Sequence, residues 1–560
     1  MLLLDWIVIG IFALGLVAIV FWVVKQKQNS SADYFLDGKD ATWIAIGASI
    51  FASNIGSEHL IGLAGAGASS GMAMAHWEIQ GWMILILGWV FVPFYSRSMV
   101  YTMPEFLERR YNSQSRTILS FISLISYVLT KVAVTVFAGG LVFQQVFGIK
   151  ELWGIDFFWI AAIGLVLLTA IYTVLGGMKS VLYTSVLQTP ILLLGSLVIL
   201  VLGLRELGGW NEMMKICGAV PTNEYGNTMT DLIRSNKDVN FPWVGALVGS
   251  AIIGFWYWCT DQYIVQRVLS GKNEREARRG SILGAYFKLT PVFLFMIPGM
   301  IAFALHQKTG AFLPLLESGA VDADTAFPVL VAKLLPAGMK GLVVCGILAA
   351  LMSSLASLFN SSAMLFTIDF YKRFKPQTPE KKLVLVGQMA TVVIVILGIL
   401  WIPIMRSVGN VLYTYLQDVQ SVLAPGIAAA FLLGVTWKRT SAQGGLWGLI
   451  TGMIIGLTRL GAKVYYSTTG ASEGYSLFRY LFYDLNWLFF CGWMFLFCVI
   501  VIVLVSMFTP APSADKIRGL VFGTATPEQK AITHASWNRW DVIHSCIVLG
   551  ITIAFYIYFW

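Results

Sequence analysis

Apolar runs of about 20 residues follow one another along nearly the whole chain and are separated by short polar segments. A helix of that length crosses the roughly 30 Å hydrocarbon core of a bilayer and pairs its own backbone groups. The short alternating segments of a membrane β-barrel are missing from the sequence. The pattern therefore predicts an all-α polytopic membrane protein with about fourteen transmembrane helices. The expected spans are 3–25, 42–66, 73–96, 117–146, 154–175, 181–204, 242–266, 282–306, 339–370, 383–405, 411–437, 443–463, 484–508 and 542–559.

The composition and the placement of charge agree with a bilayer environment. Only 12% of the residues are charged and 57% are hydrophobic, whereas a soluble domain carries about 25% charged residues. The net charge of +9 is concentrated in alternate short loops such as 97–116, 267–279 and 372–382. Cytoplasmic loops of membrane proteins are enriched in Lys and Arg in this way. We therefore expect both termini outside the cytoplasm, and the positive charge indicates membrane topology rather than nucleic-acid binding.

Several other classes of function lack support in the sequence. It contains no GxxxxGK[ST] loop, no HExxH and no soluble domain large enough for an ATPase. We therefore expect neither ATP-driven transport nor an enzyme, and no attached signalling domain suggests a sensor. The six cysteines form no CxxC pair, so neither a metal cluster nor a disulfide framework is expected. The lack of paired cysteines in an outer loop favours a bacterial inner membrane as the cell membrane, and no obligate protein partner is evident.

Ionisable residues inside the expected spans are the first candidates for a site. A charge at membrane depth costs about 2.5–3.5 kcal/mol on insertion scales, so such residues usually have a function. Each one alone could instead be a snorkelling or helix-end residue. Because they belong to several different spans, a shared polar cavity explains them better. They are Glu58, His59, Glu78, Lys131, Asp261 and Lys288.

The second span contains a stretch that favours a broken helix. Ser53, Asn54, Gly56 and Ser57 occur together near mid-membrane, and these residue types are poor in helix interiors. Secondary transporters use such breaks near the midplane to expose backbone carbonyls to ions and substrates. The alternative is a tight helix–helix contact, which the glycines of 62–71 would also suit.

A second group of oxygen atoms could meet that break. Ala350, Ser353 and Ser354 have i, i+3, i+4 spacing and share one helix face. Their hydroxyls and carbonyl, with carbonyls freed at Ala52 and Ile55, would supply five neutral oxygens. Such a set suits a monovalent cation such as sodium better than a divalent ion, which prefers carboxylates. The alternative is that the serines bond back to their own helix.

Six motifs, spread from the second to the twelfth span, carry a family resemblance. They are FASNIGSEH (51–59), RSMVYTMPEFLERR (97–110), WYWCTDQYIVQR (256–267), LAALMSSLASLFNS (348–361), FTIDFYKR (366–373) and YTYLQD (413–418) with the downstream FLLGVTWKR. With these motifs the chain resembles the sodium/solute symporter family, and within it the sodium/glucose cotransporter branch.

The resemblance implies a fold and an organisation of the chain. It implies a leucine-transporter-like core of five plus five helices in inverted repeat. Residues 1–41 would form a first helix and a cytoplasmic loop, and 438–560 peripheral C-terminal helices. The repeats would be 42–204 and 242–437, joined by an extracellular loop at 205–241. That loop and residues 307–338 are long enough for short helices or lids over an entrance.

The resemblance also implies roles for individual residues. The sodium ion would be held by the carbonyls of Ala52, Ile55 and Ala350 and the hydroxyls of Ser353 and Ser354. The residues expected to hold a sugar are Asn54, His59, Glu78, Lys288 and Gln417, with Tyr257 and Trp258 beneath it. The residues expected to close over the outside are Leu63, Trp77 and Tyr413.

Departures from the family pattern refine these expectations. Some members place an aspartate for a second sodium where this chain has Ser185, and a further hydroxyl is replaced by Ala356. We therefore expect one sodium ion for each solute. The expected function is secondary active symport of sodium with a hexose such as glucose or galactose, by alternating access. Because Glu58 and Trp77 resemble the inositol-transporting branch equally well, symport of myo-inositol or another solute is the alternative.

Overall fold

The computed structural model describes residues 2–26, 29–56, 58–316, 319–336, 338–408, 412–469 and 476–560, and it consists almost entirely of helices. The first half of the chain contains α1 (Leu3–Val24), α2 (Ser31–Leu36), α3 (Trp43–Asn54), α4 (Ala64–Ser70), α5 (Ala75–Glu78), α6 (Gly81–Ile86), α7 (Val92–Ser98), α8 (Met103–Arg110), α9 (Ser113–Ser126), α10 (Ala133–Phe147), α11 (Phe157–Leu207) and α12 (Trp210–Gly218). Two short strands, β1 (Glu151–Leu152) and β2 (Ile155–Asp156), pair antiparallel between α10 and α11.

The second half continues the helical architecture. It contains α13 (Trp243–Gly254), α14 (Gln262–Leu269), α15 (Glu274–Lys288), α16 (Ile297–Thr309), α17 (Ala326–Leu334), α18 (Met339–Met364), α19 (Lys372–Phe374), α20 (Glu380–Val408), α21 (Leu412–Thr436), α22 (Ala442–Thr469), α23 (Leu477–Arg479), α24 (Trp487–Phe508), α25 (Ala514–Ile517), α26 (Pro527–Ala535) and α27 (Arg539–Tyr558). Short 3-10 and π-helical turns join many of them: η1 (Asp37–Lys39), η2 (Glu58–Leu63), η3 (Gly71–Met74), η4 (Leu87–Phe91), η5 (Tyr127–Val132), η6 (Phe255–Thr260), η7 (Val292–Met296), η8 (Ala323–Thr325), η9 (Leu365–Tyr371) and η10 (Tyr480–Asp484).

Eleven helical segments of the described chain are long and apolar enough to cross a membrane. The larger number of expected spans has a physical explanation. α11 contains two of them, joined at Gly177, whose backbone is left-handed (φ 54°, ψ −146°). The span at 42–66 is divided between α3 and η2–α4, and the span at 117–146 between α9, η5 and α10. The structure thus confirms the predicted all-α polytopic architecture.

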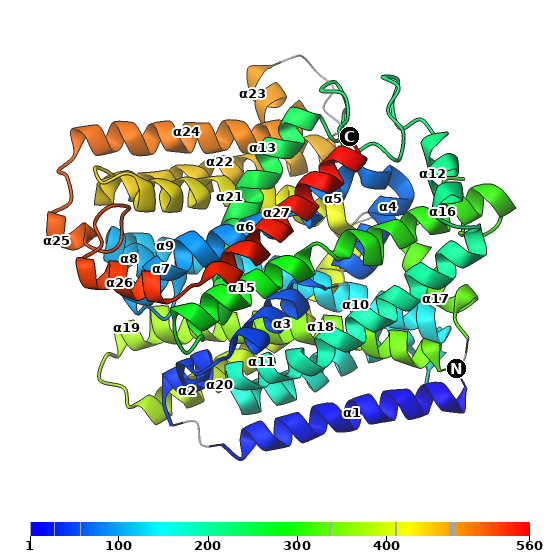
Figure 1. Cartoon of the computed structure of the whole chain (residues 1–560), viewed down its shortest axis with the longest axis horizontal. Coiled ribbons are helices and arrows are strands. Elements are labelled where there is room, and N and C mark those ends of the chain that lie inside the picture. The colour runs from blue at the N-terminus through cyan, green and yellow to red at the C-terminus, as the bar shows by residue number, and fades with distance from the viewer. Residues whose placement is uncertain are drawn as a thin grey trace.

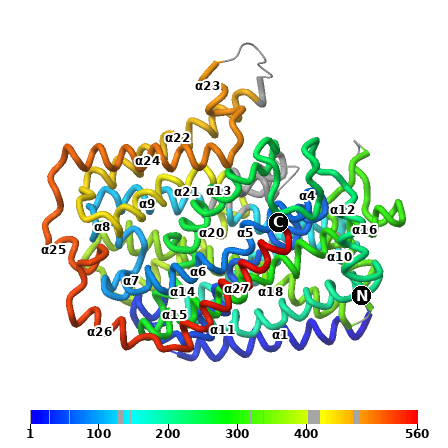
Figure 2. Tube along the Cα trace, turned by 45° about the horizontal axis from the view of Figure 1, so that its top comes forward, coloured from blue at the N-terminus to red at the C-terminus, as the bar shows by residue number. Residues whose placement is uncertain are grey.

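Both chain termini lie at the same face of the bundle. Figures 1 and 2 show the helices running side by side, with α1 along one edge and α24 along the opposite edge. The Gly338 amide donates to Asp5 Oδ1 (2.6 Å), and the Leu232 amide donates to the Phe559 carbonyl (2.9 Å). Each end of the chain therefore contacts one of the two long loops that the sequence places outside the cytoplasm. These loops contain the short helices α12 and α17.

Two spans are interrupted inside the bundle. α3 ends at Asn54, and Ile55 is extended (φ −79°, ψ 107°) before the chain continues as the π-helical turn η2. This interruption confirms the predicted break in the second span. The second break lies at Asp261, which is also extended (φ −77°, ψ 127°) and separates η6 from α14. The sequence indicates Asp261 as an intramembrane charge, but its pattern does not predict this second break.

Candidate functional site

A cavity lies where the two interrupted spans meet. Its walls include the end of α3, the segment α5 and the turn η6, which directly precedes Asp261. The cavity is therefore lined by residues from distant parts of the chain. Six of the seven residues expected to hold a sugar line it: Asn54, His59, Glu78, Tyr257, Trp258 and Lys288. The structure therefore brings together residues that are up to 234 positions apart in the sequence.

A buried polar network connects these residues. Lys288 Nζ lies 2.6 Å from Glu78 Oε2 and donates to Asn54 Oδ1 at 3.2 Å. His59 Nε2 lies 3.3 Å from the same Glu78 oxygen. The Asn54 amide donates to the Tyr257 hydroxyl at 3.2 Å. The charge of Glu78 is thus compensated, and the network presents hydrogen-bond donors and acceptors of several kinds to the cavity.

Aromatic rings and a second ion pair form the adjoining wall. Lys131 Nζ lies 2.7 Å from Asp261 Oδ2 and 4.7–5.3 Å from the rings of four aromatic residues. These aromatic residues are Tyr127, Trp256, Tyr257 and Tyr263. Tyr127 also donates to Asp261. The ion pair fixes the second break to η5. The sequence indicates both charges but not their pairing, which opposite charges in separate spans could have suggested.

The residues expected to bind sodium lie beside the first break. Ala52, Ile55, Ala350, Ser353 and Ser354 are all at most 2% exposed. Just after the break, the Gly56 amide donates to His59 Nδ1 (3.5 Å).

Tyr263 links α18 to this break. Its hydroxyl lies 3.1 Å from Ser354 Oγ and donates to the Ser53 carbonyl. Ser53 Oγ also lies 2.6 Å from Ser357 Oγ. Tyr263 and the serine pair Ser53–Ser357 therefore hold α18 against the broken end of α3. Ser353 Oγ has a further neighbour in Ser185 Oγ at 3.3 Å.

The structure describes the side chains of two of the three residues expected to close the site, Leu63 and Trp77. Leu63 is fully buried in η2. Trp77 lines the cavity, and its ring stacks on Trp487 of α24 (centroids 5.4 Å apart, 22° between planes). The side chains of Tyr413 and Gln417 lie outside the described residues, so the roles expected for these two residues stay predictions.

Other residues of the cavity were not among those expected to bind solute. Gln420 lines it and follows Gln417 by three positions on α21, a spacing that puts both on one helix face. Glu58 also lines it, with its carboxylate 4.0 Å from His59 Nδ1. Trp487 had no sequence signal, because its partner Trp77 is more than 400 positions away.

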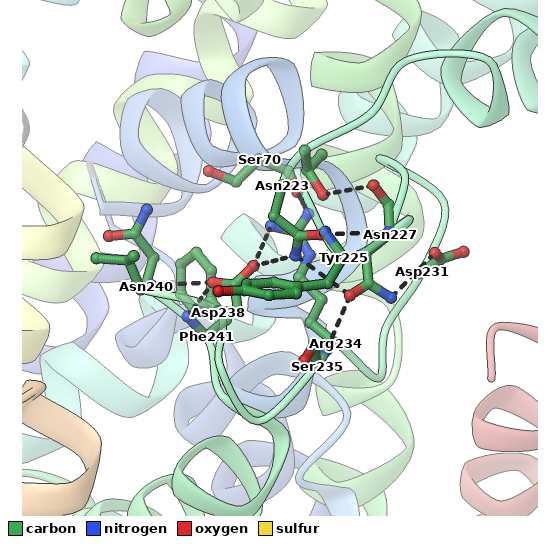
Figure 3. A network of polar contacts seen from close by, with 12 residues as sticks. Ser70, Asn223, Tyr225, Asn227, Asp231, Arg234, Ser235, Asp238, Asn240 and Phe241 are labelled. Carbon is green, nitrogen blue, oxygen red and sulfur yellow. Dashed lines mark hydrogen bonds and ion pairs between the residues drawn. The ribbon is translucent and has the colours of Figure 1, made fainter.

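The long loop after α12 braces the segment that leads into the site (Figure 3). Arg234 donates to the Ser70 carbonyl, and the Met72 amide donates to the Met229 carbonyl (2.8 Å). Inside the loop, Asn223 donates to Asp238 Oδ2 at 2.6 Å. These contacts anchor residues 70–72, a few positions before Trp77 and Glu78.

The other long loop packs on α4. The carboxylate of Asp324 in η8 lies against Gly65, where a Cβ atom would come within 2.4 Å of Asp324 Oδ1. Burial raises the pKa of Asp324 to about 7, and the like charge of Asp322 acts in the same direction.

Two interrupted spans that meet at a polar cavity, inside a bundle of membrane-crossing helices, define a secondary transporter. The family model described as the sodium:solute symporter family matches residues 34–452. The chain therefore belongs to the sodium:solute symporter family. It is a sodium-coupled solute symporter, a transport protein and not an enzyme.

Individual relatives support the same assignment. The chain is 36% identical to the sodium/myo-inositol cotransporter 2 of Homo sapiens, over 93% of this chain and 79% of that protein. It is equally 36% identical to the sodium/glucose cotransporter 4 of Mus musculus, over 93% of this chain and 78% of that protein. Among solved structures, a Na⁺-coupled sialic acid symporter in a substrate-bound outward-open state has a similar fold, with a TM-score of 0.70 and 20% identity over 91% of this chain and 99% of that one.

Proposed function

We propose that this protein couples the inward movement of one sodium ion to the uptake of a hexose such as glucose or galactose. The observation that carries the proposal is the cavity in which Asn54, His59, Glu78 and Lys288 form one buried polar network beside the first helix break. Relatives are named for glucose and for myo-inositol transport, and these names favour a small hydroxylated solute for this chain as well.

The chemistry of the cavity suits an uncharged ring with several hydroxyls. Glu78 and Asn54 accept hydrogen bonds, while Lys288 and the Asn54 amide donate them. Tyr257 and Trp258 can cover the apolar face of a pyranose ring. A carboxylate solute would need a net positive cavity, which Glu78 and Glu58 oppose. Gln417 remains a proposed sugar ligand, and Leu63, Trp77 and Tyr413 remain the proposed outer closure.

Sodium is proposed to bind between α3 and α18. The ligands would be the carbonyls of Ala52, Ile55 and Ala350 with the hydroxyls of Ser353 and Ser354. Bound there, the ion would hold the broken end of α3 against α18 and so organise Asn54 for the solute. Serine instead of aspartate at position 185 supports a single ion, because a second site would lack its negative ligand.

The sodium gradient supplies enough free energy for uptake against a solute gradient. Moving one charge through 100 mV gives about 2.3 kcal/mol. A tenfold concentration gradient adds about 1.4 kcal/mol, and together they support roughly 500-fold accumulation. Loading of both sites would let the outer residues close and the helix bundle rock to expose the cavity to the cytoplasm.

The organisation of the chain supports this cycle. We assign the repeats to 42–204 and 242–437, because each begins with a span that is interrupted, at Ile55 and at Asp261. The basic loops favour termini outside the cytoplasm in a cell membrane, and the cysteine pattern favours a bacterial inner membrane.

Myo-inositol is the second candidate solute, and one residue favours it. Glu58 lines the cavity, and its carboxylate lies 4.0 Å from the imidazole of His59. Myo-inositol carries a hydroxyl on every ring carbon, so it has one more donor for this carboxylate than glucopyranose has. The 36% identity to the sodium/myo-inositol cotransporter 2 agrees with this alternative.

Proteoliposome uptake separates these proposals. Uptake of labelled glucose should require an inward sodium gradient, and replacing sodium by choline should abolish it. Equal uptake in choline would contradict sodium coupling at this cavity. Competition by unlabelled glucose, galactose and myo-inositol then ranks the solutes. Preference for myo-inositol in the wild type, lost in Glu58→Gln, would assign the protein to the alternative.

A further inference from the structure

An apolar groove on the outside of the bundle ends in a cluster of cationic side chains. The groove has a volume of about 540 Å³ and runs between α20 and the neighbouring segments α9 and η9. Its lining includes Leu385, Met389, Val393 and Leu397 of α20, which are 47–58% exposed. α20 is one of the membrane-crossing helices, so this surface faces the hydrocarbon of the bilayer.

The shape of the groove fits a single extended chain. It extends from Lys382 to Leu397, and 15 residues of helix rise by about 22 Å. One leaflet contributes about half of the roughly 30 Å hydrocarbon thickness. An apolar groove of this length suits an acyl chain that lies along the helix.

Cationic side chains at one end of the groove indicate what kind of polar group would lie there. Lys382 lines the groove, Lys381 precedes it, and both are exposed. Glu380, the acidic residue next to them, is already occupied: it accepts bonds from Ser31, and Lys372 Nζ lies 3.3 Å from it. Within the described part of the chain, the amino groups of Lys381 and Lys382 have no hydrogen bond or ion pair.

Further cations surround the same end. Lys375 Nζ lies 5.9 Å from the ring of Tyr371, which also lines the groove. Arg373 donates to the Ser113 carbonyl and to Thr117 Oγ1, which fixes it close to α9. This cluster lies on the side that the positive-inside pattern assigns to the cytoplasm, where the leaflet carries anionic lipids.

We propose that this groove binds one anionic phospholipid, with an acyl chain along α20 and the phosphate at Lys381 and Lys382. The phosphate would compensate the unpaired ammonium groups, and the chain would cover the exposed side chains of Leu385, Met389 and Val393. A zwitterionic phospholipid has the same tails but no net negative charge to match the cluster. This site is independent of the solute and the coupling ion.

Native mass spectrometry of the full-length protein in mixed micelles tests the proposal. The probes are phosphatidylglycerol and phosphatidylcholine with identical acyl chains at equal concentration. The wild type should retain phosphatidylglycerol at least threefold more than phosphatidylcholine. Lys381→Gln/Lys382→Gln should lose this preference. Lys272→Gln/Lys530→Gln removes the same charge from other exposed positions of the expected cytoplasmic face and should keep it.

Three further outcomes test the proposal. Val393→Trp should lower retention of both lipids, because it fills the apolar part of the groove and leaves the lysines in place. An unchanged lipid preference in Lys381→Gln/Lys382→Gln would overturn the proposal. Efficient disulfide cross-linking of Val393→Cys between two copies in membranes, beyond that of the parent protein, would also overturn it, since a second copy would then occupy the groove.

Discussion

One hydroxyl distinguishes Ser354 from an alanine, and the proposed sodium site depends on it. Ser354 Oγ is buried and lies 3.1 Å from the Tyr263 hydroxyl, which donates to the Ser53 carbonyl beside the first break. The same atom can therefore serve as an ion ligand and as part of the contact between α18 and α3. The two roles predict different responses to sodium and to solute.

Ser354→Ala should weaken sodium dependence more than solute binding. Loss of one ligand is expected to raise the half-saturating sodium concentration about tenfold, which corresponds to about 1.4 kcal/mol. At saturating sodium, the apparent solute affinity should change less than threefold. Isotope uptake at varied sodium measures both. Ser196→Ala, which removes a buried hydroxyl from α11, is the matched control. Unchanged sodium dependence in Ser354→Ala would remove Ser354 from the ion site.

Lys288 has both a structural and a binding role, and a double variant separates them. Lys288→Gln leaves the charge of Glu78 buried with less compensation, since Lys288 Nζ is 2.6 Å away. Breaking a buried pair costs about 3–5 kcal/mol, so the thermal unfolding temperature should fall and uptake should be lost. Glu78→Gln/Lys288→Gln should recover most of the stability but not the uptake. Recovery of uptake in the double variant would show that neither charge contacts the solute.

The helices themselves depend on backbone positions where only glycine fits. In α11 the chain reverses at Gly177, whose φ is +54°, and a Cβ atom at this position would approach the Tyr34 carbonyl oxygen to 2.3 Å. The Tyr34 carbonyl belongs to backbone in α2 and cannot move aside as a side chain can. The junction of the two spans therefore requires a residue without a Cβ atom at position 177.

Gly177→Ala should destabilise the fold by about 2 kcal/mol or more, because it combines a strained conformation with a backbone clash. Gly164→Ala in the same helix is the control, since a Cβ atom there meets nothing within 4 Å. It should be neutral or stabilise by up to about 1 kcal/mol. Thermal unfolding followed by tryptophan fluorescence compares them. Equal unfolding temperatures for the two variants would contradict the tight contact with Tyr34.

The two helix breaks show what a sequence can and cannot predict. The first was predictable because Ser53, Asn54 and Gly56 are locally unfavourable in a helix. The second was not, since the aromatic residues before Asp261 continue an ordinary apolar span. At that break the Asp261 carboxylate pairs with the distant Lys131 and also accepts from the Tyr263 amide at the start of α14.

Long-range contacts mark a similar limit in the site. Six of the residues that line the cavity were predictable from intramembrane polarity and from family motifs: Asn54, His59, Glu78, Tyr257, Trp258 and Lys288. The stacking of Trp487 on Trp77 was not, because it arises only when the bundle forms. The roles of Ala52, Ile55, Ala350 and the serine pair remain predictions.

Over the whole molecule, the two long loops at 205–241 and 307–338 connect both termini to the core. One loop holds Phe559 through Leu232, and the other holds Asp5 through Gly338. The second loop also carries Asp324, whose carboxylate is buried against α4 just beyond the first break. Charge on that carboxylate therefore opposes the packing of the loop on the core.

The pH dependence of stability should report this contact. Because the pKa of Asp324 is raised to about 7 in the folded protein, the folded state binds its proton more tightly than the unfolded state does. Stability from this group is then complete below about pH 4 and is lost as the pH rises through about 7.

Asp324→Asn should remove that dependence and unfold at a higher temperature than the wild type above pH 7. Its free energy of unfolding there should be larger by an amount on the order of 2 kcal/mol. The exposed Asp515→Asn is the control and should follow the wild type. Thermal unfolding between pH 4.5 and 8.5 measures all three. If Asp324→Asn also follows the wild type at every pH, the carboxylate must reach water, and the loop must leave α4 for it to do so.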